Sequence, residues 1–442
     1  MVLHLPFKRT VYFHVNGGML LIFTALLALV IANSPMSAAY QSFWQHEIIL
    51  QIGNFNVFNH GGHPITVMGF INDALMAIFF FSVGLEIKRE ILVGELSSFR
   101  KALLPIIAAC GGMIFPVIIY YFITRGTEGE PGLAIPMATD IAFSLGVLSL
   151  FGKRVPISLK IFLTAFAVVD DIGGVMVIAL FYTSHLEPSF LLYSAALLAV
   201  LMICNVRKVY SRWVYLTGAC LMWYFFMQSG IHATIAGVLV AFTVPAKPRE
   251  QIGTYIQRLH ECIDVIPNEG KQRIILNQEQ ISALNNIKAA SDDAVSPLQF
   301  LEEALHRPVN YMIMPVFAFA NAGVILTDAN GNIEIGTLTW AVALGLLFGK
   351  FIGIYLFTWL IVKMKLACLG DGMTWKNLTG ICLLGGIGFT VSLFIANLSF
   401  GNQMVLLNQA KMGVILGTVM SGVIGYMVLS LTLPKKPVEE TA

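Results

Sequence analysis

Two adjacent aspartates, Asp170 and Asp171, lie in the middle of an apolar run at 161–182 that is long enough to cross a lipid bilayer. One carboxylate in the hydrocarbon core costs roughly 2.5–3.5 kcal/mol on insertion scales, and two neighbouring negative charges resist joint ionisation. Neighbours on a helix point about 100° apart, so both carboxylates cannot face one partner. The pair therefore indicates a site that binds a cation, carries protons, or does both.

A single lysine, Lys350, lies within another apolar run at 338–362 and can neutralise only one of the two aspartates. The remaining carboxylate can take a proton or a hard monovalent cation such as sodium, and the Thr139 hydroxyl and nearby backbone carbonyls could supply further oxygen ligands. A proton and a cation that share one site exclude each other, which predicts exchange. If both acids are protonated after sodium is released, two protons are exchanged for each sodium, and membrane voltage would drive the exchange.

The identity of the second proton carrier stays open at this point. Lys350 is an alternative to Asp170, because burial favours the neutral form of a lysine. A purely structural charge network of Asp170, Asp171, Lys350 and Asp140 is a further possibility. A coupled cluster of this kind titrates as a unit.

Two apolar runs that could position these residues are interrupted. The run at 132–152 contains Pro136 one turn before Asp140, and proline removes a backbone donor and clashes with the preceding turn. The run at 378–399 has three glycines within 385–388, each of which weakens a helix interior by roughly 0.5–1 kcal/mol. Interrupted spans in the two halves of a transporter point to its binding site, whereas glycines can also serve close helix packing. Asp140 could offset the positive N-terminal ends of broken helices, or serve only as a structural counter-charge.

The composition predicts an all-α polytopic membrane protein. The 442 residues are 57% hydrophobic and 12% charged, whereas soluble domains carry about 25% charged residues. The net charge of +2 is spread along the chain, so we expect no nucleic-acid partner. The six cysteines are scattered without metal-site or disulfide spacing, and we expect no cofactor and no enzymatic activity.

About twelve segments are long and apolar enough to span a bilayer, which takes about 20 residues. They are 12–33, 66–87, 102–123, 132–152, 157–182, 188–204, 212–227, 230–246, 308–325, 338–362, 378–399 and 410–432. Lys8 and Arg9 before the first segment would also suit a signal peptide, but its apolar stretch exceeds the roughly 7–15 residues typical of one. With both termini in the cytoplasm, nearly all of the 27 lysines and arginines fall on the inside; Arg125 and Lys411 fall outside.

We expect one membrane transporter domain, 1–442, with two segments outside the bilayer. The outer segment, 34–65, has apolar runs on either side of a Gly-Asn pair at 53–54, which is typical of a β-hairpin. The cytoplasmic segment, 248–306, is a polar insert between the eighth and ninth spans. Its apolar residues recur at helical spacing, so one or two amphipathic helices and a disordered segment both fit.

Further ionisable residues flank the second span. Glu86, Arg89 and Glu90 lie at its cytoplasmic end, and the i,i+3 spacing of Glu86 and Arg89 allows either a solvated ion pair or part of a pH-sensing, cation-attracting mouth. Asp73 near its start could be a helix N-cap or a funnel residue, or equally a ligand. His232, at the outer start of a later span, suits packing or hydrogen bonding better than pH sensing.

Six short motifs occur in order along the chain. They are Val-Gly-Leu-Glu-Ile-Lys-Arg-Glu at 83–90, Ala-Thr-Asp-Ile-Ala-Phe-Ser-Leu-Gly at 138–146, Val-Asp-Asp-Ile-Gly at 169–173, Phe-Ala-Phe-Ala-Asn-Ala-Gly at 317–323, Gly-Lys at 349–350 and Gly-Ile-Gly-Phe-Thr at 386–390. Together they resemble the NhaA-type sodium/proton antiporters of bacterial inner membranes. The likeness covers nearly the whole chain apart from the cytoplasmic insert.

This resemblance implies twelve helices with an inverted-topology repeat, in which two discontinuous helices cross at the bilayer midplane. It implies that Asp171 is the main sodium ligand, that lithium is a second substrate, that Asp170 pairs with Lys350, and that Asp140 balances helix ends. It also implies a homodimer whose contact is the hairpin in 34–65.

The resemblance further implies a cytoplasmic pH-sensing region that includes Glu86, Arg89 and Glu302. The chain departs from the family here, because Glu302-Glu303 stands where the family has Glu-His, and the insert precedes it. The expected function is electrogenic, pH-regulated exchange of cytoplasmic sodium or lithium for external protons. The pH of activation is the property that this departure affects.

Three other classes of protein place acids in a membrane. A proton-coupled organic-anion transporter would need more positive charge than Lys350 alone provides. An intramembrane aspartyl protease needs two aspartates from different helices facing one water, whereas Asp170 and Asp171 are adjacent on one. A channel is disfavoured because buried, charge-paired acids make a poor fast pore. Sodium dependence of proton flux would separate all three from an antiporter.

Overall fold

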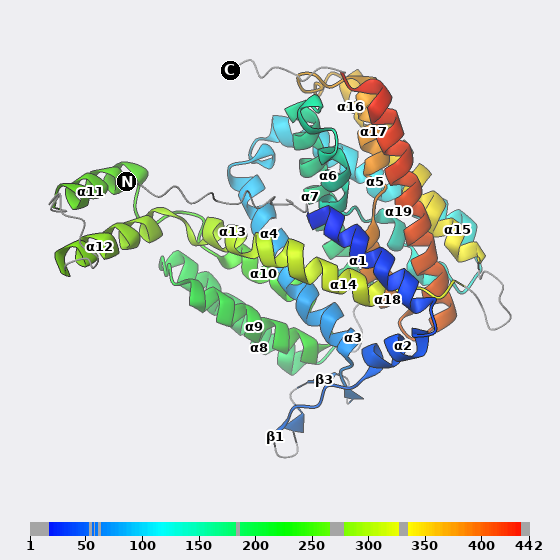
Figure 1. The fold of residues 1–442 in the computed structure, drawn as a ribbon, viewed down its shortest axis with the longest axis horizontal. Coiled ribbons are helices and arrows are strands. Elements are labelled where there is room, and N and C mark those ends of the chain that lie inside the picture. Colours follow the sequence, from blue (N-terminus) through cyan, green and yellow to red (C-terminus); the bar gives the residue numbers. More distant parts are fainter. Residues whose placement is uncertain are drawn as a thin grey trace, which may run out of the picture.

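The structure, a computed structural model, describes residues 17–52, 55–56, 58–60, 63–182, 186–265, 278–326 and 335–434, and this part of the chain is almost entirely helical (Figure 1). The helices are α1 (Gly17–Ala32), α2 (Ser37–Gln45), α3 (Val67–Phe70), α4 (Met76–Leu92), α5 (Phe99–Thr124), α6 (Ile141–Ser149), α7 (Ile157–Phe181), α8 (Pro188–Val206), α9 (Arg212–Ser229), α10 (Thr234–Thr243), α11 (Ile252–Val265), α12 (Gln278–Ala294), α13 (Pro297–Pro308), α14 (Met314–Asn321), α15 (Thr337–Leu344), α16 (Lys350–Lys363), α17 (Trp375–Leu384), α18 (Phe389–Phe400) and α19 (Met404–Thr432).

Several helices join into longer segments through π-helical turns. Such turns at Ile71–Leu75, Val309–Ile313 and Gly345–Gly349 connect α3 to α4, α13 to α14, and α15 to α16. Insertions of this kind in a helix occur often at functional sites.

Seven helical segments in the described ranges are long and apolar enough to cross a membrane, or up to nine when two bent pairs are each taken as one span. The bent pairs are α1 with α2, at 111°, and α17 with α18, at 41°. The remaining predicted spans coincide with α9, α10 and α14, which are shorter or more polar helices. The structure is thus that of a polytopic membrane protein, while the count of twelve and the inverted repeat stay predictions.

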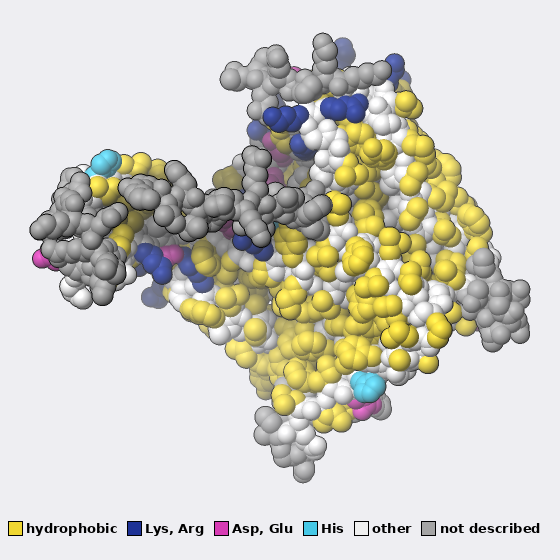
Figure 2. All heavy atoms as spheres, viewed as in Figure 1, with side chains coloured by type: hydrophobic (Ala, Val, Ile, Leu, Met, Phe, Trp, Pro, Cys, Tyr) yellow, Lys and Arg dark blue, Asp and Glu magenta, His cyan; other side chains and the backbone are white. Residues whose placement is uncertain are grey.

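The surface fits a lipid surrounding. Figure 2 shows hydrophobic side chains over most of the body, with lysines and arginines gathered near its upper edge and beside the α11–α12 extension. Large apolar side chains such as Phe122, Leu180 and Leu431 are 73%, 73% and 85% exposed. Such an extensive apolar surface would aggregate in water, and a bilayer covers it.

The helices form two groups that pack mainly within themselves. In the first group α5 packs against α7, α15 and α16, and α19 packs against α15, α17 and α18, with α6 beside α7. In the second group α4 packs against α10 and α13, α1 against α14, and α9 against α8 and α10. The groups meet where α1 contacts α6, α4 contacts α7, and α14 contacts α18. One buried apolar cluster lies within each group and a third joins them.

The two segments expected outside the bilayer project from this body in part: the strands of the first and helices α11 and α12 of the second extend from it, whereas α2 and α13 pack against it (Figure 1). In 34–65, strand β1 (Gln51–Ile52) pairs antiparallel with β2 (Phe55–Asn56), and β3 (Asn59–His60) pairs with β4 (His63–Pro64). The Gly-Asn pair at 53–54 is outside the described residues, so the hairpin and its dimer contact stay predictions.

In 248–306, α11 and α12 pack against each other and α13 follows, beginning after Ser296, whose hydroxyl accepts from the Gln299 N–H at 3.2 Å. Residues 266–277 lie outside the described part. Lys8 and Arg9 and the start of the first predicted span also lie outside it, so neither the span nor the signal-peptide alternative is tested there.

Candidate functional site

The predicted interruption at Pro136 is present. Pro136 lies in a 3-10 turn, Ile135–Met137, and the backbone is extended at Ala138 and Asp140 before α6 begins. Asp140 is the N-cap of α6, because its Oδ1 accepts from the Phe143 N–H at 3.0 Å. The proline thus ends one helical turn and the aspartate starts the next helix.

The predicted interruption at the glycines is also present. Residues 385–388 separate α17 from α18, and the two broken segments hydrogen-bond to each other where they meet. The Asp140 N–H donates to Ile387 O at 2.6 Å, and Thr139 Oγ1 donates to Gly385 O at 2.8 Å. A side chain at Gly388 would lie within 2.7 Å of the Ala138 carbonyl, so this close approach of two backbones requires glycine.

Asp140 caps two helices at once. Besides its bond to α6, its Oδ2 accepts from the first turn of α18, from Thr390 N at 3.1 Å and Thr390 Oγ1 at 2.6 Å. Each helix N-terminus carries a partial charge of about +0.5. One buried carboxylate can therefore offset two facing N-termini.

Asp170 is paired with Lys350. Lys350 Nζ lies 2.6 Å from Asp170 Oδ2, and both side chains are fully buried. The other oxygen, Oδ1, has no hydrogen bond within the described residues. The ammonium also lies 5.5 Å from the centre of the Phe166 ring. The lysine thus neutralises one member of the aspartate pair, as the resemblance implies.

Asp171 lies elsewhere, at the wall of a cavity of about 470 Å³ between the two helical groups. Polar and charged side chains from five helical segments and one chain break line it. They are Ser82, Glu86, Arg89, Thr139, Asp140, Ser149, Asp171, Glu302, His306, Asn310 and Thr390. Asp171 is only 4% exposed, whereas the side chains of Arg89 and Glu302 are 38% and 23% exposed, so the cavity opens toward the latter pair. Water or a small cation can reach the carboxylate from that mouth.

The mouth is built differently from what the sequence suggests. Arg89 pairs with Glu302 and with Glu90, both at 2.9 Å, whereas no ion pair between Glu86 and Arg89 is found in the described residues. Of the two alternatives that the i,i+3 spacing allowed, the described part of the structure does not contain the Glu86–Arg89 ion pair, because α13 brings Glu302 to the free side of the guanidinium. Burial raises the pKa of Glu302, and the nearby Arg89 charge opposes that rise. Lys88, between these residues, instead donates to Phe242 O and Val244 O at the end of α10.

The structure brings together Thr139, Asp140, Asp171, Glu86, Arg89 and Glu302 at one cavity and leaves other candidates away from it. Glu90 stays beside Arg89, and its second oxygen accepts from Glu95 N at 3.0 Å. Asp73 lies in the π-helical turn at the opposite end of α4 from Glu86, so it is not part of this mouth. Nor is it an N-cap, because Thr66 caps α3. His232 lies before α10 and outside the cavity lining.

Sequence reasoning missed three polar residues at the site. Thr390, Ser144 and His306 were not chosen as candidates. Ser144 Oγ donates to Leu384 O at 2.9 Å and ties α6 to the end of α17. Thr390 lies two residues after the last of the glycines, in the first turn of α18, and that position at a helix start was the available signal.

A buried acid at the end of a cavity, beside two interrupted and mutually bonded helical segments, defines the site as that of a membrane ion transporter. The sequence matches the profile of the family described as Na+/H+ antiporter 1 over residues 8–429. The chain belongs to this Na+/H+ antiporter family, and the family indicates sodium/proton exchange.

Relatives with the same name support this assignment. The chain is 65% identical over 438 residues to the Na(+)/H(+) antiporter NhaA of Phocaeicola vulgatus, which spans 99% of this chain and 98% of the relative. It is 58% identical over 425 residues to that of Bacteroides fragilis (96% and 97%), and 44% identical over 434 residues to that of Porphyromonas gingivalis (97% and 96%). The resemblance inferred from the six motifs is confirmed.

Proposed function

We propose that this chain exchanges cytoplasmic sodium, or lithium, for external protons in a bacterial inner membrane, with both termini in the cytoplasm. The observation that carries the proposal is the position of Asp171, which alone of the adjacent aspartates reaches the cavity while Asp170 is neutralised by Lys350. Such exchange would serve sodium and pH homeostasis.

In this proposal Asp171 is the main sodium ligand and Asp170 its neighbouring acid. Thr139 is within reach of Asp170 and lines the cavity, and it supplies a hydroxyl oxygen. Sodium binds when Asp171 is ionised, and a proton displaces it. Sodium and a proton compete for one carboxylate, and the cavity opens to the two sides of the membrane in turn only when one of them is bound. This condition gives exchange without leak.

The proposed ratio is two protons per sodium, which moves net charge and makes the exchange electrogenic. Asp171 carries one proton. The second travels with the Asp170–Lys350 pair, either on the carboxyl group or on the amine, since the pair is buried as a unit. Asp140 takes no proton in this scheme because it is engaged with the ends of α6 and α18.

The mouth residues regulate access. Arg89 is held between Glu90 and Glu302, and Glu86 lies deeper along the same wall. Protonation of Glu302 weakens its ion pair with Arg89 and changes the charge that a cation meets on entry. pH regulation is therefore proposed to act at this cluster rather than at Asp171.

Two further parts of the proposal concern assembly. The 34–65 segment mediates a homodimer, and the apolar surface contacts bilayer lipid. No cofactor and no nucleic acid take part.

The test uses inside-out vesicles with a preformed proton gradient and a pH-sensitive dye. We expect sodium and lithium, but not potassium, to dissipate the gradient, with a rate that depends on pH. Asp171→Asn should abolish the response, while the matched surface variant Asp371→Asn should retain it. Normal sodium exchange by Asp171→Asn would show that the proposed site is wrong, and no response to any cation in the parent would refute the exchange itself.

A further inference from the structure

Three asparagines hydrogen-bond to one another across three helical segments of the described chain. Asn321 Nδ2 donates to Asn72 Oδ1 at 2.9 Å, and Asn397 Nδ2 donates to Asn321 Oδ1 at 2.7 Å. Asn321 is fully buried and its two partners are half-buried. Interhelical amide bonds of this kind hold helices together where no water is available. We refer to Asn72, Asn321 and Asn397 as the asparagine chain.

The asparagine chain lies beyond the closed end of the cavity. Three helical segments present the same order along one face: a residue that lines the cavity, an apolar layer one turn on, and an asparagine beyond it. The residues are Val391, Phe394 and Asn397 on α18; Met314, Phe317 and Asn321 on α14; and Val83, Phe80, Met76 and Asn72 on α4 and the π-helical turn before it. Because residues three or four apart share a helix face, the three orders stack into three layers.

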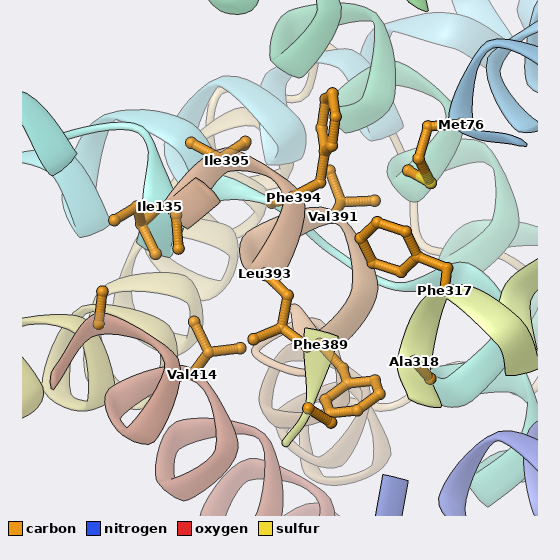
Figure 3. Packing of buried hydrophobic residues seen from close by; sticks show 14 of the residues in the cluster. Met76, Ile135, Phe317, Ala318, Phe389, Val391, Leu393, Phe394, Ile395 and Val414 are labelled. Carbon is orange, nitrogen blue, oxygen red and sulfur yellow. The ribbon is translucent and has the colours of Figure 1, made fainter. Parts of the chain in front are cut away.

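The middle layer is a dry seal. Phe80 and Phe394 have ring centres 5.9 Å apart, and those of Phe317 and Phe394 are 6.5 Å apart. All three rings are at most 1% exposed. Figure 3 shows Phe317 and Met76 beside Phe394 and Val391. Polar groups thus lie on both sides of an apolar layer that separates them.

The asparagine chain also crosses between the two helical groups. Asn72 and Asn321 belong to the second group, and Asn397 belongs to the first. The end of α14 is fixed within its own group, because Asn33 Nδ2 donates to Val324 O at 2.8 Å and Leu326 N donates to Asn33 Oδ1 at 2.9 Å. Asn321 is therefore a firmly held acceptor, and the Asn397 bond is a hydrogen bond that must break, together with the apolar contact of Phe317 and Phe394, if the groups move apart there.

We propose that the Asn321–Asn397 hydrogen bond is a latch that keeps the outer route to Asp171 closed in this conformation, with Asn72 orienting Asn321. The inference rests on the exchange proposed above, in which the cavity opens to the two sides in turn. An outward opening has to separate α18 from α14 beyond the aromatic layer, which breaks the latch, and closing restores it. A neutral amide suits this task because it adds no charge that competes with Asp171 for sodium.

The test measures access to the cavity from each side. In a background with the six native cysteines replaced, Val391→Cys reports on the cavity through its rate of modification by a membrane-impermeant thiol reagent in right-side-out and inside-out vesicles. Asn397→Leu removes the latch with little change in side-chain size. We expect the rate from the outside to rise roughly three- to tenfold, the range for one net hydrogen bond, while the rate from the inside does not rise.

Controls separate a latch from general loosening. Ser399→Ala removes a 3.0 Å bond from Ser399 to Tyr182 OH near the same end of α18, but this bond stays within the first group, so neither rate should change. Asn321→Leu breaks the same latch, and the Asn321→Leu/Asn397→Leu pair should add little to either single change. An unchanged outside rate in both single variants, or a parallel rise from both sides, would overturn the proposal. Labelling needs no sodium exchange, so a failure of the proposed function would be seen separately.

Discussion

The buried Asp170–Lys350 pair gives a quantitative prediction. Both side chains are fully buried at an N–O distance of 2.6 Å, so removal of one leaves the other charged and without a counter-ion. Loss of one partner of a buried pair costs about 3–5 kcal/mol, whereas replacement of both by neutral residues of similar size is often near neutral. We therefore expect Lys350→Met to lower the free energy of unfolding by about 3–5 kcal/mol, and Asp170→Asn/Lys350→Met to restore most of it.

The assay is reversible denaturation of the purified protein in detergent, followed by helix content, with the two single variants and the double variant forming a complete cycle. Lys363→Met is the matched control on the same helix α16, where the ammonium is exposed and lies 4.4 Å from the Trp359 ring centre. Replacement of Lys363 should lower the free energy of unfolding by no more than about 1 kcal/mol. Equal stability of Lys350→Met and the parent, or a double variant no better than the single, would refute the charge-pair reasoning.

Two further predictions concern a mouth residue and a buried cap. Burial raises the pKa of Glu302, so it loses its proton at a higher pH than an exposed glutamate and its charged form costs stability as pH rises through that window. Glu302→Gln should flatten the acid side of the pH–exchange profile, and exposed Glu303→Gln should not; identical profiles for Glu302→Gln and the parent would exclude the role. Thr390→Val removes the 2.6 Å bond to Asp140 and should cost about 1.5–3 kcal/mol in denaturation. The hydroxyl of Thr358 has no partner among the described residues, so Thr358→Val should hardly change the free energy of unfolding. Equal losses of stability in Thr390→Val and Thr358→Val would contradict this account.

Local chemistry made the two interruptions predictable. Proline lacks a backbone N–H and glycine lacks a side chain, so Pro136 and the glycines at 385–388 mark weak points in any helix regardless of what surrounds them. The pairing of Lys350 with one aspartate was predictable for a similar reason, because an uncompensated charge in lipid is too costly to leave unpaired. These inferences needed no knowledge of the fold.

Contacts between distant segments were not predictable in the same way. Thr390 bonds Asp140 across 250 residues, and nothing near either residue indicates the other. For Arg89 the sequence favoured Glu86 on the same helix, but a guanidinium has several donors and takes the carboxylate that packing brings nearest, which is Glu302 on α13. Asp73 shows the same limit, since helical periodicity does not reveal which end of a span faces the cavity.

The charges nearest Asp171 bear on the proposal that one monovalent ion binds there. The two helix N-termini that Asp140 caps contribute about +0.5 each, which matches one carboxylate. The positive charge of Lys350 offsets the negative charge of Asp170. In the proposed exchange, the negative charge of Asp171 at the end of the cavity is the one that a sodium ion or a proton neutralises, and Glu86 lies farther along the same wall. A divalent cation would leave an excess positive charge in a low-dielectric site, so the charge balance itself favours the competition on which exchange depends.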